Sequence, residues 1–414
     1  MQRTPTITPL PTHRRLRIGF LHPVLGLGGA ERWVVDAALA LQALGHDVTI
    51  FTAAYDAARA FPETHDGSLD VRVRGGFLPA TVGGRLQAPC AIARLCWLAG
   101  ATMAGPERFD VLISDIAPYS LPLLRAWGKA RGGARPKMVY YCHYPDQLLA
   151  PPRHGWYRAY RAPLDRLEGP AMRTADQVLV NSQFTARAAA RLGVGPTEVI
   201  YPGVNAEAYA NISDLRGDEN IILVVSRFDP RKNQALAVNA FARLRALAPD
   251  VFARTSLALA GGLDASRHED RATAAELTAL IRQQGLDDKV TLHASPSETE
   301  RLELLRRCLC VLHPAPDEHF GIVPVEAMAA GRPVVAVANA GPLETIVDGE
   351  TGFLCPPTPD AFAQALGKLG RDAALRARLG RAGRLRATRF SHRAFGAALE
   401  GALARLFDGP DARS

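Results

Sequence analysis

Residues 16–51 read LRIGFLHPVLGLGGAERWVVDAALALQALGHDVTIF. The apolar run 16–21 predicts a buried strand, and the glycine-rich turn 26–29 follows it. The apolar spacing over residues 30–44 predicts a helix, and residues 47–51 predict a second strand. Together these signals indicate a βαβ unit, in which two parallel strands are connected by a helix that covers the sheet.

The alternation of strands and helices continues and then restarts after a polar segment at residues 205–219. Further strands are predicted at 111–114, 137–142, 177–180, 198–201, 221–225, 256–260, 290–293, 310–313 and 333–337. We therefore expect an N-terminal Rossmann-like domain over residues 14–204 and a second one over residues 205–385. A helix at 386–408 is expected to pack back on the first domain. Two such α/β domains would face each other across a deep cleft, where ligands of parallel sheets bind.

The composition is that of a globular protein long enough for two domains, with 414 residues, 48% hydrophobic and 22% charged. The first dozen residues lack the apolar core of a signal peptide, so we expect a cytoplasmic protein. The apolar stretch 88–105 contains Arg94, which argues against a membrane span but allows contact with a membrane surface. Six scattered cysteines have no metal-binding spacing and are expected to be buried thiols.

The net charge of +8 is concentrated in residues 121–175, which hold ten Lys/Arg and three Asp/Glu together with seven Trp and Tyr residues. Basic residues interleaved with Trp and Tyr suit an anionic membrane surface or an anionic substrate. A solvated helical face is the alternative, and nucleic acid is not expected as a partner.

Two segments of the second half carry candidate donor-binding residues. Arg227 and Lys232 follow the predicted strand 221–225, and an Arg fork with a Lys charge would hold a diphosphate. A plain surface turn is the other interpretation. The second segment, Glu318-His-Phe320-Gly321-Ile322-Val323-Pro324-Val-Glu326, predicts a helix start, because proline suits a first turn. The open N–H groups of this helix would contact phosphate. Glu326 would bind a ribose and Glu318 would bind the donor sugar. Chance placement of the two glutamates is the alternative.

The first half offers weaker candidates. Gly28 and Gly29 lie between a strand and a helix, where the backbone can approach a phosphate, although a plain tight turn explains them as well. His143, Tyr144 and Asp146 follow the predicted strand 137–142, and His143 and Asp146 could orient an acceptor hydroxyl or a phosphate. A core or capping histidine remains the alternative there.

Taken together, these segments resemble family 4 of the retaining glycosyltransferases, which have the GT-B fold. Glu318 and Glu326 match that family's pair of glutamates, and Arg227 and Lys232 match its donor-phosphate pair. Five further segments are similar to the α-1,3/1,6-mannosyltransferases of asparagine-linked glycosylation: residues 21–32, 45–52, 141–146, 160–165 and 180–185. Val24 departs from the motif of those enzymes, which usually has Asp there, and the segment 226–233 reads as a general family 4 loop.

The resemblance implies an enzyme that moves mannose from GDP-mannose to a lipid-linked oligosaccharide, with retention and without a metal or other cofactor. Arg227, Lys232, Glu318 and His143 would then be the catalytic set. Gly28, Gly29, Phe320, Gly321, Ile322, Val323 and Glu326 would join Arg227 and Lys232 in binding the donor, and His143, Tyr144 and Asp146 would bind the acceptor. The enzyme would act in the cytoplasm or peripherally on the cytoplasmic face of a membrane.

Two other functions stay open at this stage. A family 4 transferase could use another nucleotide-sugar and build lipopolysaccharide or exopolysaccharide. A non-catalytic nucleotide-sugar-binding protein could keep the fold, although the complete set of Arg227, Lys232, Glu318 and Glu326 argues against loss of the site. An NAD-dependent enzyme is disfavoured, since Glu31 stands where the dinucleotide fingerprint needs its third glycine.

Overall fold

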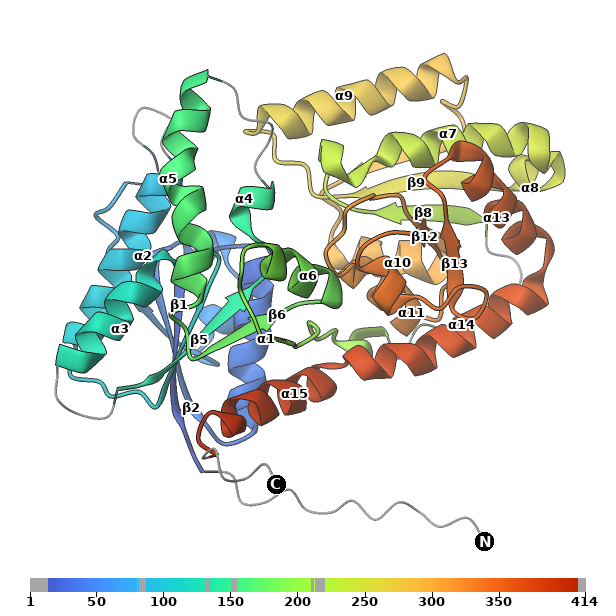
Figure 1. Cartoon of the computed structure of the whole chain (residues 1–414). Coiled ribbons are helices and arrows are strands. Elements are labelled where there is room, and N and C mark those ends of the chain that lie inside the picture. Colours follow the sequence, from blue (N-terminus) through green and yellow to red (C-terminus); the bar gives the residue numbers. More distant parts are fainter. Residues whose placement is uncertain are drawn as a thin grey trace, which may run out of the picture. The chain divides into compact units, whose positions relative to one another are not determined.

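The protein forms two compact units in a computed structural model that describes residues 14–79, 81, 87–130, 135–149, 155–209, 212 and 220–408 (Figure 1). The first unit holds the described residues up to Asn181, Thr185–Ile200 and the residues from Phe395 on. The second unit holds Ser182–Phe184 and Tyr201–Ala394. The chain therefore passes from the first unit to the second at Ile200 and returns in the C-terminal helix.

The first unit is built on a seven-stranded parallel sheet with the order β3-β2-β1-β4-β5-β6-β7. Its strands are β1 Arg17–Leu25, β2 Asp47–Tyr55, β3 Asp70–Val73, β4 Val111–Asp115, β5 Lys137–Cys142, β6 Gln177–Val180 and β7 Thr197–Val199. Its helices are α1 Gly29–Ala43, α2 Gln87–Ala104, α3 Leu121–Ala130, α4 Asp146–Leu149, α5 Gly155–Met172, α6 Gln183–Arg191 and α15 His392–Arg405.

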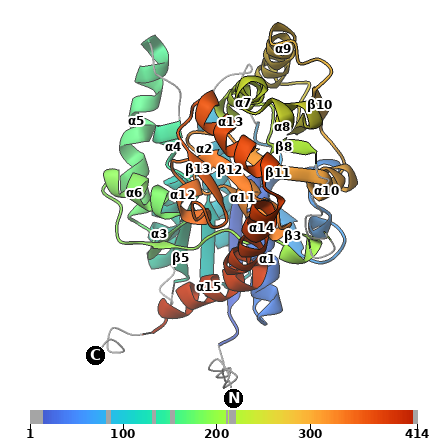
Figure 2. The ribbon, with the colours of Figure 1, turned by 90° about the vertical axis from the view of Figure 1, so that its right-hand side faces the viewer.

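Both faces of this sheet are covered by helices, which explains why its strands are continuous apolar runs. On one face, Val34 and Leu41 of α1 and Leu399 of α15 are fully buried against the sheet. Figure 2 shows α15 beside α1, and a side chain at Gly396 would touch Ala40. On the other face, α2, α3 and α6 bury a second apolar cluster.

The second unit repeats this arrangement with a six-stranded parallel sheet of order β10-β9-β8-β11-β12-β13. Its strands are β8 Ile221–Val225, β9 Ser256–Gly261, β10 Val290–Ala294, β11 Cys308–His313, β12 Val334–Val337 and β13 Gly352–Cys355. Its helices are α7 Gln234–Leu247, α8 Pro249–Arg254, α9 His268–Gln283, α10 Glu298–Arg307, α11 Ile322–Ala329, α12 Pro342–Thr345, α13 Pro359–Arg371 and α14 Ala373–Ala387. In Figure 1, α7, α8 and α9 lie above this sheet, and α10, α11 and α14 lie below it.

The two sheets share one topology, because each grows outward in both directions from its first strand. The direction reverses between β1 and β4 in the first unit and between β8 and β11 in the second. Ligands of such sheets bind outside the carboxyl ends of the strands at this switch point. The loops after β1 and β4, and after β8 and β11, are therefore the first places to look for a site.

The predicted fold class of two Rossmann-like α/β domains agrees with these sheets, and the strands over residues 137–142, 177–180 and 221–225 are confirmed without change. The sequence did not predict β3 or β13. The predicted connection over residues 205–219 is wrong in its first part, because residues 206–209 form a 3₁₀ turn and Tyr209 is buried in the second core. The rest of that segment lies outside the described residues, except for Ile212, which is also buried there.

The apolar stretch at 88–105 belongs to the core of the first unit. It forms α2, whose Leu95 and Leu98 are fully buried, whereas Trp97 is half exposed. Arg94 is buried too, and its guanidinium donates two hydrogen bonds to the carbonyl of Leu78. No helix among the described residues combines the length and the hydropathy that a membrane crossing requires. The membrane-contacting surface that we predicted from this stretch therefore retains Trp97 as its exposed large apolar side chain.

The basic and aromatic stretch at 121–175 needs a similar correction. Tyr140 and Tyr141 lie in β5 and are almost completely buried, one on each face of the sheet. They are core residues and do not contribute to a surface. Trp127 of α3 is exposed and Tyr144 is half-buried, while the side chains of Trp156, Tyr157 and Tyr160 lie outside the described residues.

Candidate active site

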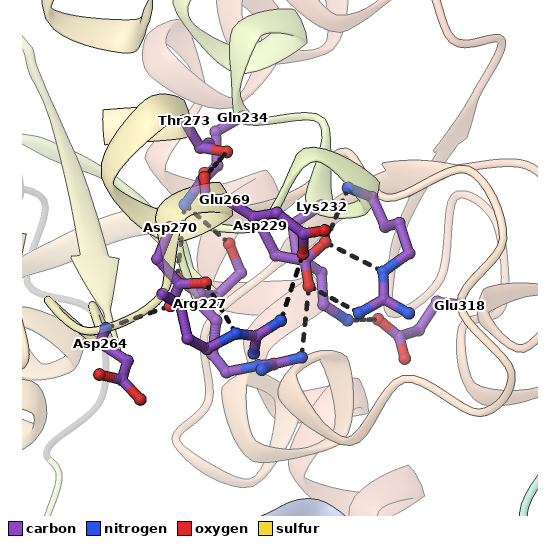
Figure 3. A network of polar contacts seen from close by, with 12 residues as sticks. Arg227, Asp229, Lys232, Gln234, Asp264, Glu269, Asp270, Thr273 and Glu318 are labelled. Carbon is purple, nitrogen blue, oxygen red and sulfur yellow. Dashed lines mark hydrogen bonds and ion pairs between the residues drawn. The ribbon is translucent and has the colours of Figure 1, made fainter. Parts of the chain in front are cut away.

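In the second unit, the loop after β8 is organised by the buried carboxylate of Asp229. Its Oδ1 accepts hydrogen bonds from the backbone N–H and the Nε of Arg231, both at 3.0 Å. Its Oδ2 accepts from Nη2 of Arg231 at 2.7 Å and from Nη2 of Arg227 at 3.4 Å. These arginines lower the pKa of Asp229 to about 2, against the effect of its burial. One carboxylate thus holds two exposed guanidinium groups at the carboxyl end of β8 (Figure 3).

Lys232 ends the same loop and points to Glu318, which follows β11 (Figure 3). The Nζ of Lys232 lies 2.6 Å from Oε2 of Glu318, and Nε2 of His313 lies 3.5 Å from the same oxygen. Burial alone would raise the pKa of Glu318, but His313 and Lys232 lower it well below its usual range. Lys232, which we predicted to bind a donor phosphate, and Glu318, which we predicted to bind the donor sugar, therefore form an ion pair at the switch point of the second sheet.

The predicted helix start after Glu318 is confirmed, with α11 beginning at Ile322 and Pro324 in its first turn. Gly321 precedes it with φ +86°, a left-handed conformation that a side chain would strain. No side chain caps this end, so the first N–H groups of α11 are available to an anion. The ring of Phe320 is buried against Tyr201 and Phe390, so the donor contact predicted for this residue would come from its backbone and stays a prediction.

Glu326 lies in the second turn of α11. Its Oε2 lies 3.2 Å from Nη1 of Arg301, whose Nη2 donates to the hydroxyl of Tyr209 at 3.0 Å. Burial raises the pKa of Glu326, and Arg301 opposes this change. Arg301 and Tyr209 were not identified from the sequence, and Arg301 holds one oxygen of the carboxylate that we predict for a ribose.

In the first unit, His143 is part of a polar chain that begins inside the sheet. Its Nε2 lies 3.1 Å from Oδ2 of Asp115, the last residue of β4, and Oδ1 of Asp115 lies 2.8 Å from Nδ1 of His22 in β1. His22 and Asp115 are buried at the switch point of the first sheet, whereas the side chain of His143 is 26% exposed. A histidine fixed in this way can present its remaining nitrogen to a ligand.

Asp146, which we also predicted to bind the acceptor, makes its polar contacts with residues of the first unit. Its carboxylate pairs with the buried Arg161, and its backbone N–H donates to Oε1 of Glu168 at 2.6 Å. Tyr144 beside it is half-buried. The structure therefore brings His143 into a buried charged network and gives Asp146 a structural partner.

The carboxylate of Glu31 lies beside the glycine turn that precedes α1. Gly28 is the N-cap residue of α1, and a side chain at Gly28 would clash with the carboxylate of Glu31. A side chain at Gly29 would meet nothing within 4 Å. Since Glu31 supplies a negative charge beside Gly28, a phosphate here would meet a like charge, and the phosphate contact of Gly28 and Gly29 stays a prediction.

Comparison with known proteins agrees with this two-unit arrangement. The family model described as Glycosyltransferase Family 4 matches residues 27–208, and the one described as Glycosyl transferases group 1 matches residues 205–386. The alpha-1,3/1,6-mannosyltransferase ALG2 of Homo sapiens is 40% identical over 91% of this chain and 92% of its own length. That of Dictyostelium discoideum is 35% identical over 92% of this chain and 96% of its own.

The chain belongs to the alpha-1,3/1,6-mannosyltransferase ALG2 family. It is a glycosyltransferase, and the family resemblance that we drew from its motifs is confirmed. Solved structures share the fold at lower identity. Sucrose-phosphate synthase from Thermosynechococcus elongatus has a TM-score of 0.73 at 24% identity, covering 95% of this chain and 99% of that one. The glycosyltransferase WaaG has a TM-score of 0.68 at 18% identity, covering 95% and 100%. The GT-B fold is confirmed by these structures and the two parallel sheets.

The structure places five charged or polar residues beside the predicted ones that the sequence analysis did not identify. They are His22, Asp115, Asp229, Arg301 and His313. One sequence signal could have identified some of them, since charged groups are rarely buried without a function or a partner. His22 interrupts the apolar strand β1, and Asp115 and His313 end the apolar strands β4 and β11. Ile116, directly after Asp115, has φ +66°, a conformation that only the structure reveals.

The lowered pKa of Asp229 predicts an acid-sensitive contribution to stability. A carboxylate with a lowered pKa stabilises the fold above its unfolded pKa, given as 3.8 for Asp, and loses this contribution as the pH falls through its folded value of about 2. We expect Asp229→Asn to have a lower free energy of unfolding than the wild type at neutral pH. This difference should shrink as the solution is acidified through that range.

Urea unfolding at a series of pH values measures this difference. Asp287→Asn is the matched control, because Asp287 is 62% exposed and its arginine partner lies 3.8 Å away. That variant should follow the wild type at every pH. A difference for Asp229→Asn that stays constant on acidification would contradict the prediction.

Proposed function

We propose that this glycosyltransferase moves mannose from GDP-mannose to a lipid-linked oligosaccharide, with retention of the anomeric configuration and without a metal ion. The proposal is carried by the likeness to mannosyltransferases over nine-tenths of the chain, together with the charged site at the switch point of the second sheet. The names of those relatives state both linkages, 1,3 and 1,6. We extend that activity to this chain.

The charges of the second unit suit the departure of a nucleoside diphosphate. As the bond between sugar and diphosphate breaks, negative charge accumulates on the diphosphate, and fixed positive groups stabilise it. Arg227, Lys232 and the first N–H groups of α11 are the groups we assign to this task. Glu318, held ionised beside Lys232, would accept hydrogen bonds from hydroxyls of the donor sugar. In retaining transfer of this kind, the acceptor hydroxyl approaches from the side on which the diphosphate leaves and gives its proton to it.

A donor screen tests the proposed function. We expect purified protein to be stabilised against heat by GDP-mannose, and to turn it over, in preference to other GDP-sugars and to UDP-sugars. Turnover should be unchanged in EDTA. Preference for a UDP-sugar would discard the mannose assignment and favour the alternative of a family 4 transferase with another donor. Binding without turnover, even with a lipid-linked acceptor present, would favour the non-catalytic alternative.

Removal of the Lys232 charge should affect the chemical step. Losing one charged donor from such a site costs about 3 kcal/mol in the barrier, so we expect Lys232→Ala to reduce turnover at least roughly a hundredfold. Circular dichroism and thermal unfolding would establish that the variant is folded. Lys368→Ala is the matched control, because Lys368 lies on the exposed side of α13 beside Phe353. Near-normal turnover in Lys232→Ala would remove this residue from the mechanism.

We also propose that the first unit contacts the cytoplasmic face of an anionic membrane, where a lipid-linked acceptor would be embedded. Leu123 and Trp127, four residues apart on α3, are exposed. Trp97 on α2, the helix packed against α3, is exposed as well, and its ring contacts that of Phe77. Trp at such a surface suits the interfacial region of a bilayer, and the exposed Arg166 of α5, a helix that contacts α3, adds positive charge.

Vesicle flotation measures this contact. We expect the wild type to bind vesicles with anionic lipid more strongly than neutral ones, and the double variant Leu123→Ser/Trp127→Ala to bind less. Leu385→Ala in the second unit is the control, since Leu385 is also exposed and should not change flotation. No binding to either vesicle by the wild type would contradict the proposal.

A further inference from the structure

Asp115 holds a histidine on each of its two carboxylate oxygens, at 2.8 Å for His22 and at 3.1 Å for His143. The side chains of Asp115 and His22 are 2% and 1% exposed, so this carboxylate is shielded from water. A buried carboxylate destabilises the fold unless an opposite charge and hydrogen bonds compensate for its lost hydration. Such an arrangement in the interior therefore calls for an explanation beyond packing.

The charge on Asp115 is compensated by His22. Burial works against a charge on His22, but Asp115 outweighs it and raises the pKa of His22 to about 10. The pKa of Asp115 is lowered, because the two histidines outweigh its burial. On its other side, Nε2 of His22 lies 3.9 Å from Oε1 of Glu31, which adds a second negative charge nearby. At neutral pH, His22 is thus a cation and Asp115 an anion.

An ionised carboxylate can only accept hydrogen bonds, which determines the proton positions on both rings. The nitrogens that face Asp115, Nδ1 of His22 and Nε2 of His143, must each carry a proton. When the ring of His143 is neutral, its Nδ1 is therefore the unprotonated nitrogen and accepts hydrogen bonds. Asp115 selects one of the two tautomers of His143.

The orientation of His143 is restricted from other sides as well. Its ring makes edge contacts with the rings of Trp33 and Tyr141, at centroid distances of 5.6 and 4.9 Å. Its backbone carbonyl accepts a hydrogen bond from Nδ2 of Asn181 at 2.7 Å. With the backbone, the ring plane and Nε2 all fixed, the position of Nδ1 is fixed too.

We propose that Asp115 is a positioning residue of the transferase, which acts through His143 by presenting its Nδ1 as an acceptor to a hydroxyl group of a bound sugar. His22 supports this role as the countercharge of Asp115. The inference rests on the proposed function, because Nδ1 of His143 would meet a sugar hydroxyl only if the protein transfers sugars. Asp115, unlike His22 and His143, lies outside the segments that carried the family resemblance.

The tautomer of His143 can be measured without any substrate. In the full chain labelled with ¹⁵N-histidine, the ring nitrogens of His143 are assigned from the signals that His143→Ala lacks. At a pH where this ring is neutral, we expect a protonated Nε2 and an unprotonated Nδ1 in the wild type. Asp115→Asn should shift the signals toward the opposite tautomer, since an amide can donate to Nε2. A wild-type His143 with the proton on Nδ1, or no shift in Asp115→Asn, would overturn the inference.

Steady-state kinetics with the preferred donor then test whether Asp115 acts through His143. We expect Asp115→Asn to lower kcat/KM by roughly a hundredfold, as misplacement of a positioning group does. In the double variant with His143→Ala, the loss should be no larger than in His143→Ala alone, because both changes remove one function. Losses that multiply would overturn the inference. Ser114→Ala, the buried neighbour of Asp115 in β4, is the control for packing and should keep wild-type kinetics.

The two experiments separate this inference from the proposed function. If no nucleotide-sugar is turned over by the wild type, the proposed function fails, and with it the role of Nδ1 toward a sugar. If turnover is found and Asp115→Asn behaves like Ser114→Ala, the positioning role fails while the transferase activity stands.

Discussion

Ionised carboxylates paired with histidine and lysine side chains at the ends of parallel strands are the interaction on which both candidate sites depend. In the first unit, Asp115 at the end of β4 is held by His22 and His143. In the second, Glu318 after β11 is held by Lys232 and His313. Each carboxylate lies at the point where its sheet reverses direction, a place left open by the helices that cover the rest of the sheet.

This interaction explains how charged groups can stay in place without a ligand. A buried charge without a partner would be neutralised by a shift of its pKa or would move to water. Here Asp115 and Glu318 keep lowered pKa values although burial acts in the other direction. The sites are therefore charged before a substrate arrives, and little reorganisation is needed when charge develops during a reaction.

The loop after β8 shows how the backbone supports this arrangement. Gly261 ends the neighbouring strand β9, and a side chain there would clash with the carbonyl of Ser226. Glycine at this position lets the end of β9 approach the loop that carries Arg227 and Lys232. Asp229 then holds the guanidinium groups of Arg227 and Arg231 from inside. A short segment of chain thus presents three cationic side chains, of which Arg227 and Lys232 were predicted from the sequence and Arg231 was not.

Much of the architecture could be predicted because a buried parallel strand has a local signal. The run 221–225 is apolar throughout, and two glycines, Gly261 and Gly262, mark the end of the run 256–260. β3 was missed because its residues, Asp70–Val73, alternate between charged and apolar at the edge of the sheet. The role of residues 88–105 was misjudged, because a helix of the same apolar composition can pack either against a sheet or against a membrane. The burial of Leu95 and Leu98 shows that this helix belongs to the core.

By itself, the sequence determined the two-domain α/β fold, the family, and the donor-site candidates Arg227, Lys232, Glu318 and Glu326, since these depend on local patterns and motif spacing. Only the tertiary structure decided which charges meet. His22, Asp115 and His143 are separated by 93 and 28 positions, and Lys232 and Glu318 by 86. No local pattern encodes such pairs, because the order of the strands in the sheet brings them together.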